Sequence, residues 1–510
     1  MYSEITSGAV LGVSAYIVRV EVDVATGLPC FNMVGLLSNE TRESRERVTV
    51  ALKNASLDIP PGHITVNLSP ADVKKEGTAF DLPIAIGMLE ALGYFEERMT
   101  KNTLFLGELG LSGEIKPVRG VLPIVRAAKD KGIKRFVLPR ENVAEGAVIP
   151  DITIIGVGDV RELLDFLQNP EHSYVEPVIT DGVCFAEQNR EDGTDFVQVK
   201  GQETAKRAAE IAAAGFHNLL MLGPPGAGKS MIAKRIPGIL PPLTVEESLE
   251  VTSIYSVAGL LKGEAQLVTD RPFQAPHHSI SQAALLGGGS RIRPGMISLA
   301  HRGVLFLDEL PEFQRYILDG LRQPLEEHYI VIARAAGNVS YPADFMLVCA
   351  LNPCPCGYFP DRNRCRCTEQ EIHRYLGKIS GPILDRIDLC VELQPVELPK
   401  LQSKNKGERS ADIRKRVESA RQLQKERFKN TGYRFNGEMD SSDTEKYCRL
   451  GPEEEAYMEH IYHSLQLSAR AYHRVLKVAR TIADLDGKEE ISKEHLLEAV
   501  CYRPPATYFR

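Results

Sequence analysis

The pattern of apolar and polar residues divides the chain into regions of different periodicity. From Ile5 to about Leu167, short runs with the alternating pattern of β-strands are interleaved with runs that place apolar residues at helical spacing. This interleaving predicts a mixed α/β domain over residues 1–167. The clearest expected strands are 16–24, 64–68 and 152–157, and the clearest expected helices are 80–92 and 123–131.

A second region follows a stretch without periodicity. Residues 168–195 are rich in Glu, Asp, Pro, Asn and Gly, a composition that is typical of a linker. An Ala-rich helical run at 203–214 and a short apolar strand at 218–222 then lead into a glycine loop, after which a helix is expected to begin near Lys229. We therefore predict a second α/β domain over residues 196–395.

Helical spacing dominates the last part of the chain. Two helices are expected at 465–483 and 493–500. Residues 396–510 are therefore predicted to form a C-terminal helical lid domain. The first helix of this lid carries apolar residues at Ile413, Val417, Ala420 and Leu423.

Composition and charge exclude few classes of protein. A chain of 510 residues is too long for one hydrophobic core, which agrees with several domains. The net charge of −7 argues against a chain coated in positive charge, although a local basic surface is compatible with it. The apolar runs are far shorter than the roughly 20 residues that cross a bilayer, and we expect no secretory leader. A cytoplasmic protein without membrane contacts is expected.

A glycine-rich loop joins the strand at 218–222 to the next helix. Its sequence fits the pattern G-x-x-x-x-G-K-[ST] and has the strand and helix on either side that this pattern requires. Glycines allow backbone N–H groups to turn towards phosphate oxygens, Lys229 supplies a charge to the β- and γ-phosphates, and Ser230 offers a hydroxyl to Mg²⁺. The sequence therefore predicts a site for ATP and Mg²⁺. The loop consists of Gly223, Pro224, Pro225, Gly226, Ala227, Gly228, Lys229 and Ser230.

Polar side chains follow two further apolar strands. Asp308 and Glu309 come directly after the run at 303–307, where open α/β sheets bind their ligands. We expect Asp308 to hold Mg²⁺ together with Ser230, and Glu309 to polarise the water that attacks ATP. Asn352 follows a third strand and either orients that water or is an ordinary turn residue before a proline.

Four cysteines lie close together after this third strand. They form two C-x-C pairs with eight residues between the pairs. Four thiolates can hold a structural Zn²⁺ tetrahedrally, although C-x2-C is the more usual spacing. A reduced cysteine-rich loop is the alternative. The four residues are Cys354, Cys356, Cys365 and Cys367.

Six segments between residues 199 and 389 carry more distinctive motifs. They are VKGQE (199–203), GPPGAGKS (223–230), RPFQAPHH (271–278), AHRGVLFLDEL (300–310), NPCPCG (352–357) and SGPILDRIDL (380–389). In these segments the chain resembles the ComM/YifB family of magnesium-chelatase-like AAA+ ATPases, and the resemblance runs nearly end to end. It implies a P-loop AAA+ core of the chelatase-like type with inserted β-hairpins, and assembly into a homohexameric ring.

The resemblance also assigns roles to single residues. By comparison with the family, Asn352 is similar to the first sensor, Arg386 to the arginine finger that reaches a neighbouring subunit's γ-phosphate, and Arg470 to the second sensor on the lid. Arginine suits these positions because its charge is permanent and its planar fork matches phosphate oxygens. Without the family, Arg386 and Arg470 have the pattern of surface ion pairs and a solvated helix face.

The inserted hairpins are expected at about 285–299 and 330–345. They contain arginines that either present a cationic surface to DNA in a central pore or are ordinary solvated side chains. The family context favours the pore, and the shortage of aromatic residues favours contacts with the DNA backbone over base stacking. These candidate DNA contacts are Arg291, Arg293 and Arg334.

The amino-terminal region resembles the proteolytic domain of Lon-type proteases over residues 64–140. The matching segments include KEGTAFDLP (75–83) and GEIKPVRGV (113–121). Ala79 and Leu122 stand where that family has its serine nucleophile and lysine base, and neither side chain can do this chemistry. A Lon-like α/β domain without protease activity is therefore expected.

Together these features predict an ATP-hydrolysing hexameric motor that acts on single-stranded or branched DNA. The resemblance to the family implies helicase or branch-migration work during recombination of incoming DNA in natural transformation. The alternative is a chelatase-like ATPase that remodels a protein partner. The Lon-like domain is expected to count against that alternative.

Overall fold

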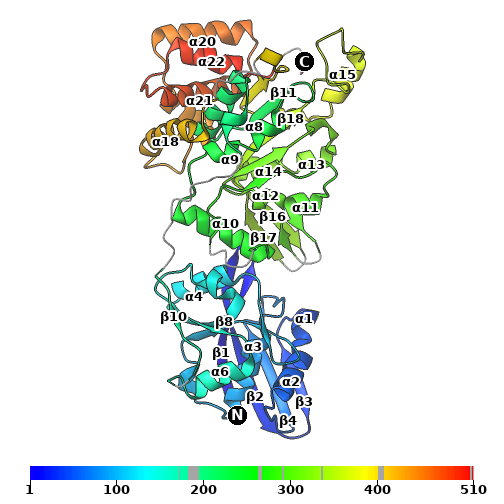
Figure 1. Cartoon of the computed structure of the whole chain (residues 1–510), viewed down its shortest axis with the longest axis vertical. Helices are drawn as coiled ribbons and strands as arrows, with labels where there is room; N and C mark the ends of the chain where they lie inside the picture. The colour runs from blue at the N-terminus through cyan, green and yellow to red at the C-terminus, as the bar shows by residue number, and fades with distance from the viewer. Residues whose placement is uncertain are drawn as a thin grey trace.

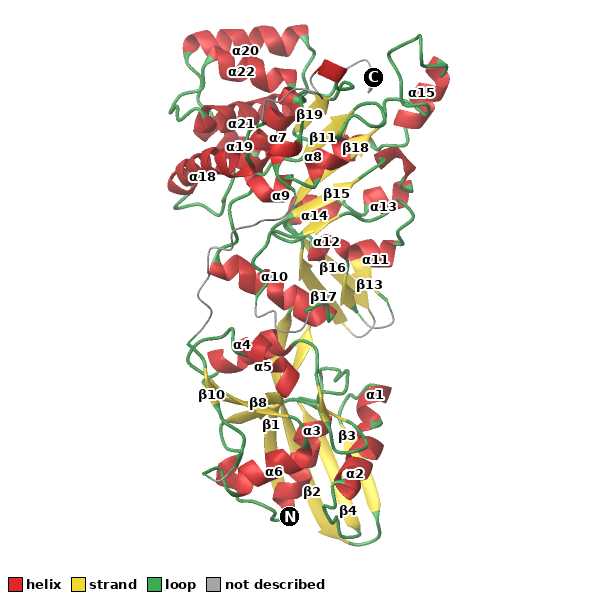
Figure 2. Cartoon of the chain, viewed as in Figure 1, coloured by secondary structure: helices red, strands yellow, loops and turns green. Residues whose placement is uncertain are grey.

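The computed structural model describes residues 1–171, 173–181, 194–261, 267–289, 292–334, 337–399, 407–505 and 508. The amino-terminal domain occupies one end of an elongated molecule, and the P-loop domain and the C-terminal helices occupy the other (Figure 1). Strands concentrate in the two sheets of these lobes, and helices surround them (Figure 2). No helix of the described ranges is both long and apolar enough to cross a bilayer.

An eight-stranded mixed sheet forms the centre of the amino-terminal domain. Its order is β10-β9-β8-β5-β1-β2-β4-β3, and β1 and β2 form a long antiparallel ribbon joined at Gly12. The strands and helices expected from the sequence are present here. The strands are β1 (Tyr2–Leu11), β2 (Ser14–Thr26), β3 (Cys30–Val34), β4 (Gly62–Ser69), β5 (Thr103–Phe105), β8 (Arg135–Pro139), β9 (Thr153–Val157) and β10 (Val178–Ile179), with β6 (Glu108–Leu109) and β7 (Ile115–Lys116) apart. The helices are α1 (Asn39–Arg42), α2 (Ser44–Asn54), α3 (Asp81–Ala91), α4 (Val121–Asp130), α5 (Val143–Gly146) and α6 (Val160–Gln168).

The P-loop domain is built on a five-stranded parallel sheet. Its order is β12-β15-β18-β11-β19, so the strand that precedes the glycine loop lies between the last two strands of the sheet in chain order. Every residue of β11, β15 and β18 is buried, as expected for parallel strands covered on both faces. The carboxyl ends of all five strands meet at one edge. The strands are β11 (Leu219–Leu222), β12 (Phe273–Gln274), β15 (Val304–Leu307), β18 (Met346–Leu351) and β19 (Leu389–Glu392).

Helices cover both faces of this sheet. Because side chains alternate along a strand, Leu219 and Met221 pack on one face with the C-terminal helices, whereas Leu220 and Leu222 pack on the other. The helices of the P-loop domain are α7 (Glu203–Gly215), α8 (Lys229–Ala233), α9 (Ile236–Ile239), α10 (Val245–Ala258), α11 (Gln282–Leu286), α12 (Met296–Leu299), α13 (Arg315–Asp319), α14 (Arg322–Glu327), α15 (Glu369–Leu376) and α16 (Gly381–Leu384). The C-terminal helices are α18 (Ser410–Arg427), α19 (Ser441–Tyr447), α20 (Pro452–Ser464), α21 (Ala469–Leu485) and α22 (Lys493–Cys501).

Two antiparallel hairpins are inserted into the P-loop domain, as the family resemblance implies. The first joins β13 (Gly287–Gly288) to β14 (Arg293–Pro294), and the second joins β16 (Tyr329–Arg334) to β17 (Gly337–Pro342). The second hairpin lies on the side of the domain that faces the amino-terminal domain (Figure 1).

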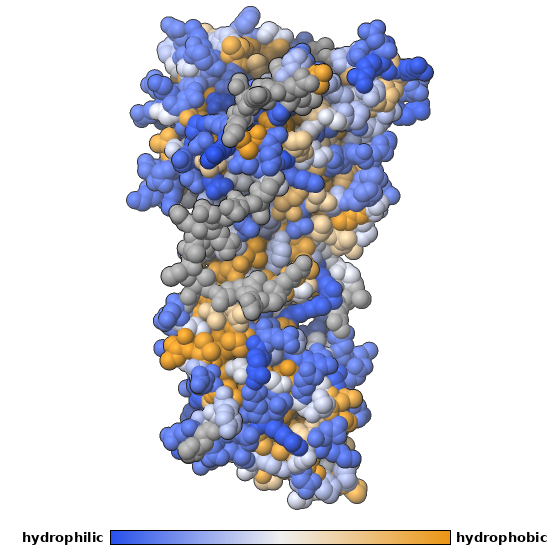
Figure 3. Space-filling model, in the orientation of Figure 1, coloured by the Kyte–Doolittle hydropathy of each residue, from blue (hydrophilic) through white to orange (hydrophobic). Residues whose placement is uncertain are grey.

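The two lobes are in direct contact. Helix α4 packs against α10, and Leu249 of α10 joins the apolar cluster of the amino-terminal domain. Ser256 of α10 donates a hydrogen bond to the buried carboxylate of Glu145. A Cβ atom built on Gly12 would lie 2.8 Å from the carbonyl oxygen of Ser340, so the β1–β2 turn touches β17. On the face drawn in Figure 3, apolar residues gather near the level of this junction.

Candidate nucleotide site

The glycine loop leaves the carboxyl end of β11 and enters α8 at Lys229. Gly226 and Gly228 have φ angles of +79° and +94°, which are readily accessible to glycine and strained for other residues. The Lys229 ammonium donates hydrogen bonds to the carbonyl oxygens of Gly223 (2.6 Å) and Pro224 (3.0 Å). Burial lowers the pKa of Lys229 to about 8, although the carboxylates nearby oppose the shift. A buried cation thus lies within the glycine loop, held by two of its carbonyl oxygens.

Strands β15 and β18 bring the other predicted polar groups to the same place. The Ser230 hydroxyl donates to the Asp308 carboxylate at 2.7 Å, and the Asn352 side-chain oxygen accepts from Lys229 at 3.0 Å. Glu309 follows Asp308 with a φ of +53°, and 54% of its side chain is exposed. The structure therefore places these predicted site residues around the end of Lys229.

Two further residues of the distinctive motifs, His278 and Gln202, lie beside this site. His278 of the segment 271–278 has its Nδ1 atom 3.5 Å from the Glu309 carboxylate. Gln202 of the segment 199–203 donates to the carbonyl oxygens of Ala227 (2.9 Å) and Gln394 (2.7 Å), and so ties the glycine loop to the chain after β19. The two motifs lie far from the glycine loop in sequence, so only the fold reveals these contacts.

This set of groups fits a magnesium nucleotide. The loop supplies backbone donors, Lys229 supplies positive charge, and Ser230 and Asp308 together offer the hydroxyl and carboxylate oxygens that Mg²⁺ prefers. Gly223 has no space for a side chain, because a Cβ atom there would lie 2.5 Å from the Leu393 carbonyl oxygen. Ser230 and Asp308, the Mg²⁺ ligands that the sequence predicts, lie in contact with each other.

Arg386 and Arg470 lie at the opposite edge of the sheet. Asn218, which immediately precedes β11, donates from its side chain to the Arg386 carbonyl oxygen at 2.8 Å, and Arg386 pairs with Glu326 of α14. Arg470, in the first turn of α21, contacts Asp385 at 3.2 Å. Burial and then the charge of Arg470 lower the pKa of Arg386, as expected for neighbouring cations. The structure brings these two arginines together and separates both from the glycine loop of the same chain.

A buried ionic network links Arg271 of the segment 271–278 to Arg302 of the segment 300–310. The Arg271 guanidinium donates to the carbonyl oxygens of Pro241 and Arg302 and to the Glu247 carboxylate. Arg302 donates to Asp344 at 2.6 Å, at the base of the second hairpin. These distinctive motifs thus include structural ion pairs at the amino ends of β12, β15 and β18, which is the sheet edge opposite the glycine loop.

Asp344 connects the second hairpin to the C-terminal helices. His328, beside the start of β16, and Arg434, between α18 and α19, both pair with its carboxylate. Burial would raise the pKa of Asp344, but the His328 hydrogen bond and the charge of Arg302 outweigh burial and lower it to about 2. The hairpin base is therefore held by several charges at once.

Only one of the candidate DNA contacts has a described side chain. Arg293 is exposed in β14. Arg291 lies outside the described residues, and Arg334 is described only through its backbone, which pairs with Gly337. Among the three candidates, Arg293 is therefore the one whose described side chain reaches solvent.

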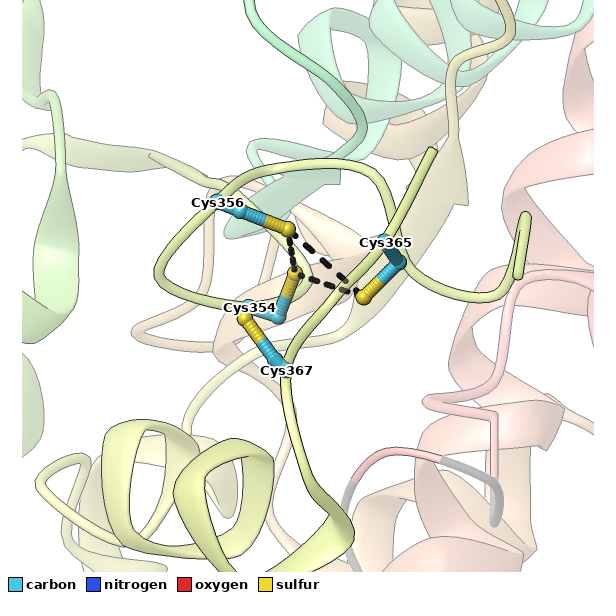
Figure 4. Close-up of side chains that lie close together, drawn as sticks. All are labelled: Cys354, Cys356, Cys365 and Cys367. Atoms are coloured by element: carbon cyan, nitrogen blue, oxygen red, sulfur yellow. Dashed lines mark hydrogen bonds between the residues drawn. The ribbon is translucent and has the colours of Figure 1, made fainter. Parts of the chain in front are cut away.

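The four cysteines converge as the sequence suggests. Figure 4 shows their side chains pointing toward one another, two from the loop after β18 and two from the returning chain. The Sγ atom of Cys354 lies 3.3 Å from that of Cys356 and 3.7 Å from that of Cys365, and all four sulfurs lie within 4.8 Å of one another. All four are free thiols. Cys354 and Cys365 are buried, whereas Cys356 and Cys367 are partly exposed.

The positions of the Lon dyad are apolar and enclosed. Leu122 is buried, Ala79 packs on the same cluster, and Leu249 of α10 covers that cluster. Glu145 accepts the Leu122 N–H and the Ser256 hydroxyl there. The amino-terminal domain thus uses this face for contact with α10.

Known proteins resemble the chain along nearly all of its length. Family models match residues 195–401 (magnesium chelatase, subunit ChlI), residues 20–142 (subunit ChlI of Mg-chelatase) and residues 407–503 (magnesium chelatase, subunit ChlI C-terminal). Because the second model covers the amino-terminal domain, this domain does not by itself count against a chelatase-like function. The prediction that this domain counts against such a function was wrong.

Individual relatives agree with the family models. Competence protein ComM of Haemophilus influenzae is 43% identical over 502 residues, which cover 98% of this chain and 96% of that protein. The uncharacterized protein YifB of Escherichia coli is 43% identical over 501 residues, 97% of this chain and 96% of its own. Lon protease 2 of Bacillus subtilis is 28% identical over 172 residues, 30% of each chain. The chain therefore belongs to the ComM/YifB family of magnesium-chelatase-like AAA+ ATPases.

Proposed function

We propose that this protein hydrolyses ATP at sites shared between the subunits of a homohexameric ring. The observation that carries the proposal is the position of Arg386 and Arg470 at the sheet edge opposite Lys229. Strand β11 separates the two edges by about 13 Å, given roughly 3.3 Å per residue. An arginine side chain is shorter than this, so Arg386 and Arg470 do not reach the glycine loop of their own chain. Each chain therefore carries the glycine loop of one site at one edge of the sheet and the arginines of another site at the opposite edge. Head-to-tail contacts in a closed ring join such halves.

Within such a site, each residue has a distinct task. Lys229 and the loop N–H groups bind the β- and γ-phosphates, and Ser230 and Asp308 hold Mg²⁺, which neutralises charge on the phosphates when bound. Glu309, oriented by His278, accepts a proton from the attacking water. Asn352 helps to place that water.

The two arginines complete the site from the neighbouring subunit. Arg386 is the finger that stabilises charge developing on the γ-phosphate, and Arg470 is the second sensor. Both are held in place by carboxylates of their own chain, Glu326 and Asp385. We place Arg470 with the finger because it contacts the residue next to Arg386.

The substrate that this motor moves is proposed to be DNA. The full-length similarity to a protein named competence protein ComM supports helicase or branch-migration work on single-stranded or branched DNA during natural transformation. The exposed Arg293 in the first hairpin supplies a cation for a phosphate backbone. Because we expect a cytoplasmic protein, we propose that its substrate is DNA in the cytoplasm.

The test is ATP hydrolysis with and without single-stranded and branched DNA over a range of salt. DNA should stimulate turnover, and the stimulation should fade as salt rises, because phosphate contacts release counterions. Arg293→Ala should weaken DNA binding and lower the salt slope by about 1. Arg449→Ala, a change at an exposed arginine of the C-terminal domain, is the matched control. A rate of ATP hydrolysis that is the same with and without every DNA tested would contradict a DNA motor.

A chelatase-like ATPase that remodels a protein partner is the second candidate. It is favoured by the three family models, all described as magnesium chelatase subunit ChlI. A pull-down with the Glu309→Gln variant in the presence of ATP separates the two. Specific capture of one protein, together with turnover that ignores DNA, would favour this candidate.

A further inference from the structure

We propose that Cys354, Cys356, Cys365 and Cys367 bind one structural Zn²⁺, and that this metal holds the glycine loop in its nucleotide-binding shape. The second half of this inference rests on the proposed nucleotide site, whereas the first half does not. The cluster lies two residues beyond Asn352, so it continues the strand that supplies the first sensor.

The sulfur geometry fits a tetrahedral metal site. A Zn–S bond of about 2.3 Å places the sulfurs of a tetrahedral site about 3.8 Å apart. The three short distances among Cys354, Cys356 and Cys365 are 3.3, 3.7 and 3.6 Å. A disulfide needs about 2.05 Å, and unlinked thiols gain little from this crowding. Four converging sulfurs match zinc better than either alternative.

The surroundings of the cluster suit its charge. Zn²⁺ with four thiolates carries a net charge of −2, which the loop can balance with Arg362, Arg364 and Arg366. The Arg362 guanidinium donates to the Cys367 carbonyl oxygen at 3.0 Å, and the Phe359 N–H donates to the Cys354 sulfur at 3.4 Å. Such outer contacts orient thiolate ligands and stabilise their charge. All four positions are sulfur, so the site is closed and structural.

Gly357 connects this metal loop to the nucleotide site. It lies between the two cysteine pairs, with a φ of +84°. A Cβ atom built there would lie 2.6 Å from Cδ of Pro225 in the glycine loop. The metal loop therefore packs directly on the loop that binds phosphates, and a loop folded around zinc fixes that contact. Loss of the metal should therefore weaken the packing of Gly357 on Pro225 and make the position of Asn352 less fixed.

The first test is the metal content of the full-length protein purified without chelator. We expect about one zinc per chain, released by a mercurial reagent that titrates thiolates. Cys354→Ser should lose the zinc, and Cys448→Ser, at a buried cysteine of the C-terminal domain, should keep it. Absence of zinc from wild-type protein with reduced cysteines, or iron in its place, would overturn the site. Release from the wild type answers this question even if Cys354→Ser does not fold.

The second test addresses the coupling. Gly357→Ala should keep its zinc but bind a fluorescent ATP analogue on the order of tenfold more weakly, because the new methyl group and the positive φ strain the contact with Pro225. Gly381→Ala, where a Cβ atom meets nothing within 4 Å, is the control. Unchanged affinity in Gly357→Ala and in zinc-stripped protein would overturn the coupling. Zinc-loaded wild type that binds no nucleotide would instead contradict the proposed function.

Discussion

The placement of Arg386 far from the glycine loop of its own chain makes a quantitative prediction for mixed rings. Arg386→Ala alone should lower turnover by on the order of 10³, the usual effect of removing an arginine finger. Lys229→Ala should abolish nucleotide binding by its own loop but leave its Arg386 intact. Each variant therefore damages a different face of the subunit.

Mixing the two variants should restore activity. In a ring, each site joins the loop face of one subunit to the arginine face of the next. With equal amounts and random exchange, half of the loop faces and half of the arginine faces are intact, so about a quarter of the sites are complete. The mixture should thus recover up to about a quarter of wild-type turnover.

The assay is steady-state ATP hydrolysis after subunit exchange, at several ratios of Lys229→Ala to Arg386→Ala. A mixture of Lys229→Ala with Glu309→Gln is the control, because both changes damage the same face and no complete site can form. Activity that stays at the sum of the two separate variants at every ratio would refute the shared site. Recovery in the control mixture would also refute it.

Three further predictions concern single residues. Glu309→Gln should bind ATP but hydrolyse it very slowly and accumulate as a stable assembly in size-exclusion chromatography with ATP; rapid turnover would show that another group acts as the base. Nucleotide affinity should fall about tenfold between pH 7 and pH 9, because Lys229, with a pKa of about 8, loses its charge in that interval and must regain a proton to bind phosphate; a flat titration with a fluorescent nucleotide would contradict this. Asp344→Asn should destabilise the protein by about 3 kcal/mol at pH 7, because Arg302 and His328 lose a buried partner. That loss should shrink as pH falls from about 4 to 2, because the unfolded chain takes up a proton at Asp344 in this range before the folded protein does, and an unchanged difference in unfolding midpoint would argue against the network.

The sequence predicted which residues of the candidate nucleotide site lie close together. The glycine loop and the acidic strand end are short-range patterns whose neighbours in sequence are also their neighbours in space. Asn352 and the cysteine cluster follow from the same logic, since each lies at or just beyond the end of β18. The two hairpins required knowledge of the family, because their strands are short and weakly patterned.

Longer-range relations could not be predicted. His278 and Gln202 reach the site through contacts that only the folded sheet creates. Lys75, a charged residue between Lys74 and Glu76, is completely buried and donates to the Val73 carbonyl oxygen. A lysine stem packs like an apolar chain when its ammonium finds a partner, so charge alone did not predict exposure.

The contact between the β1–β2 turn and β17 has a mechanical consequence. Gly12 rests on Ser340, and behind it β1 and β2 run as a continuous antiparallel ribbon into the amino-terminal sheet. Such a ribbon is stiff along its length, because hydrogen bonds join the two strands. A movement of the second hairpin would therefore displace the β1–β2 ribbon and, with it, the whole amino-terminal sheet. Under the proposed ATPase cycle, the amino-terminal domain would then move together with the hairpin, and its contacts with other molecules would oppose that movement.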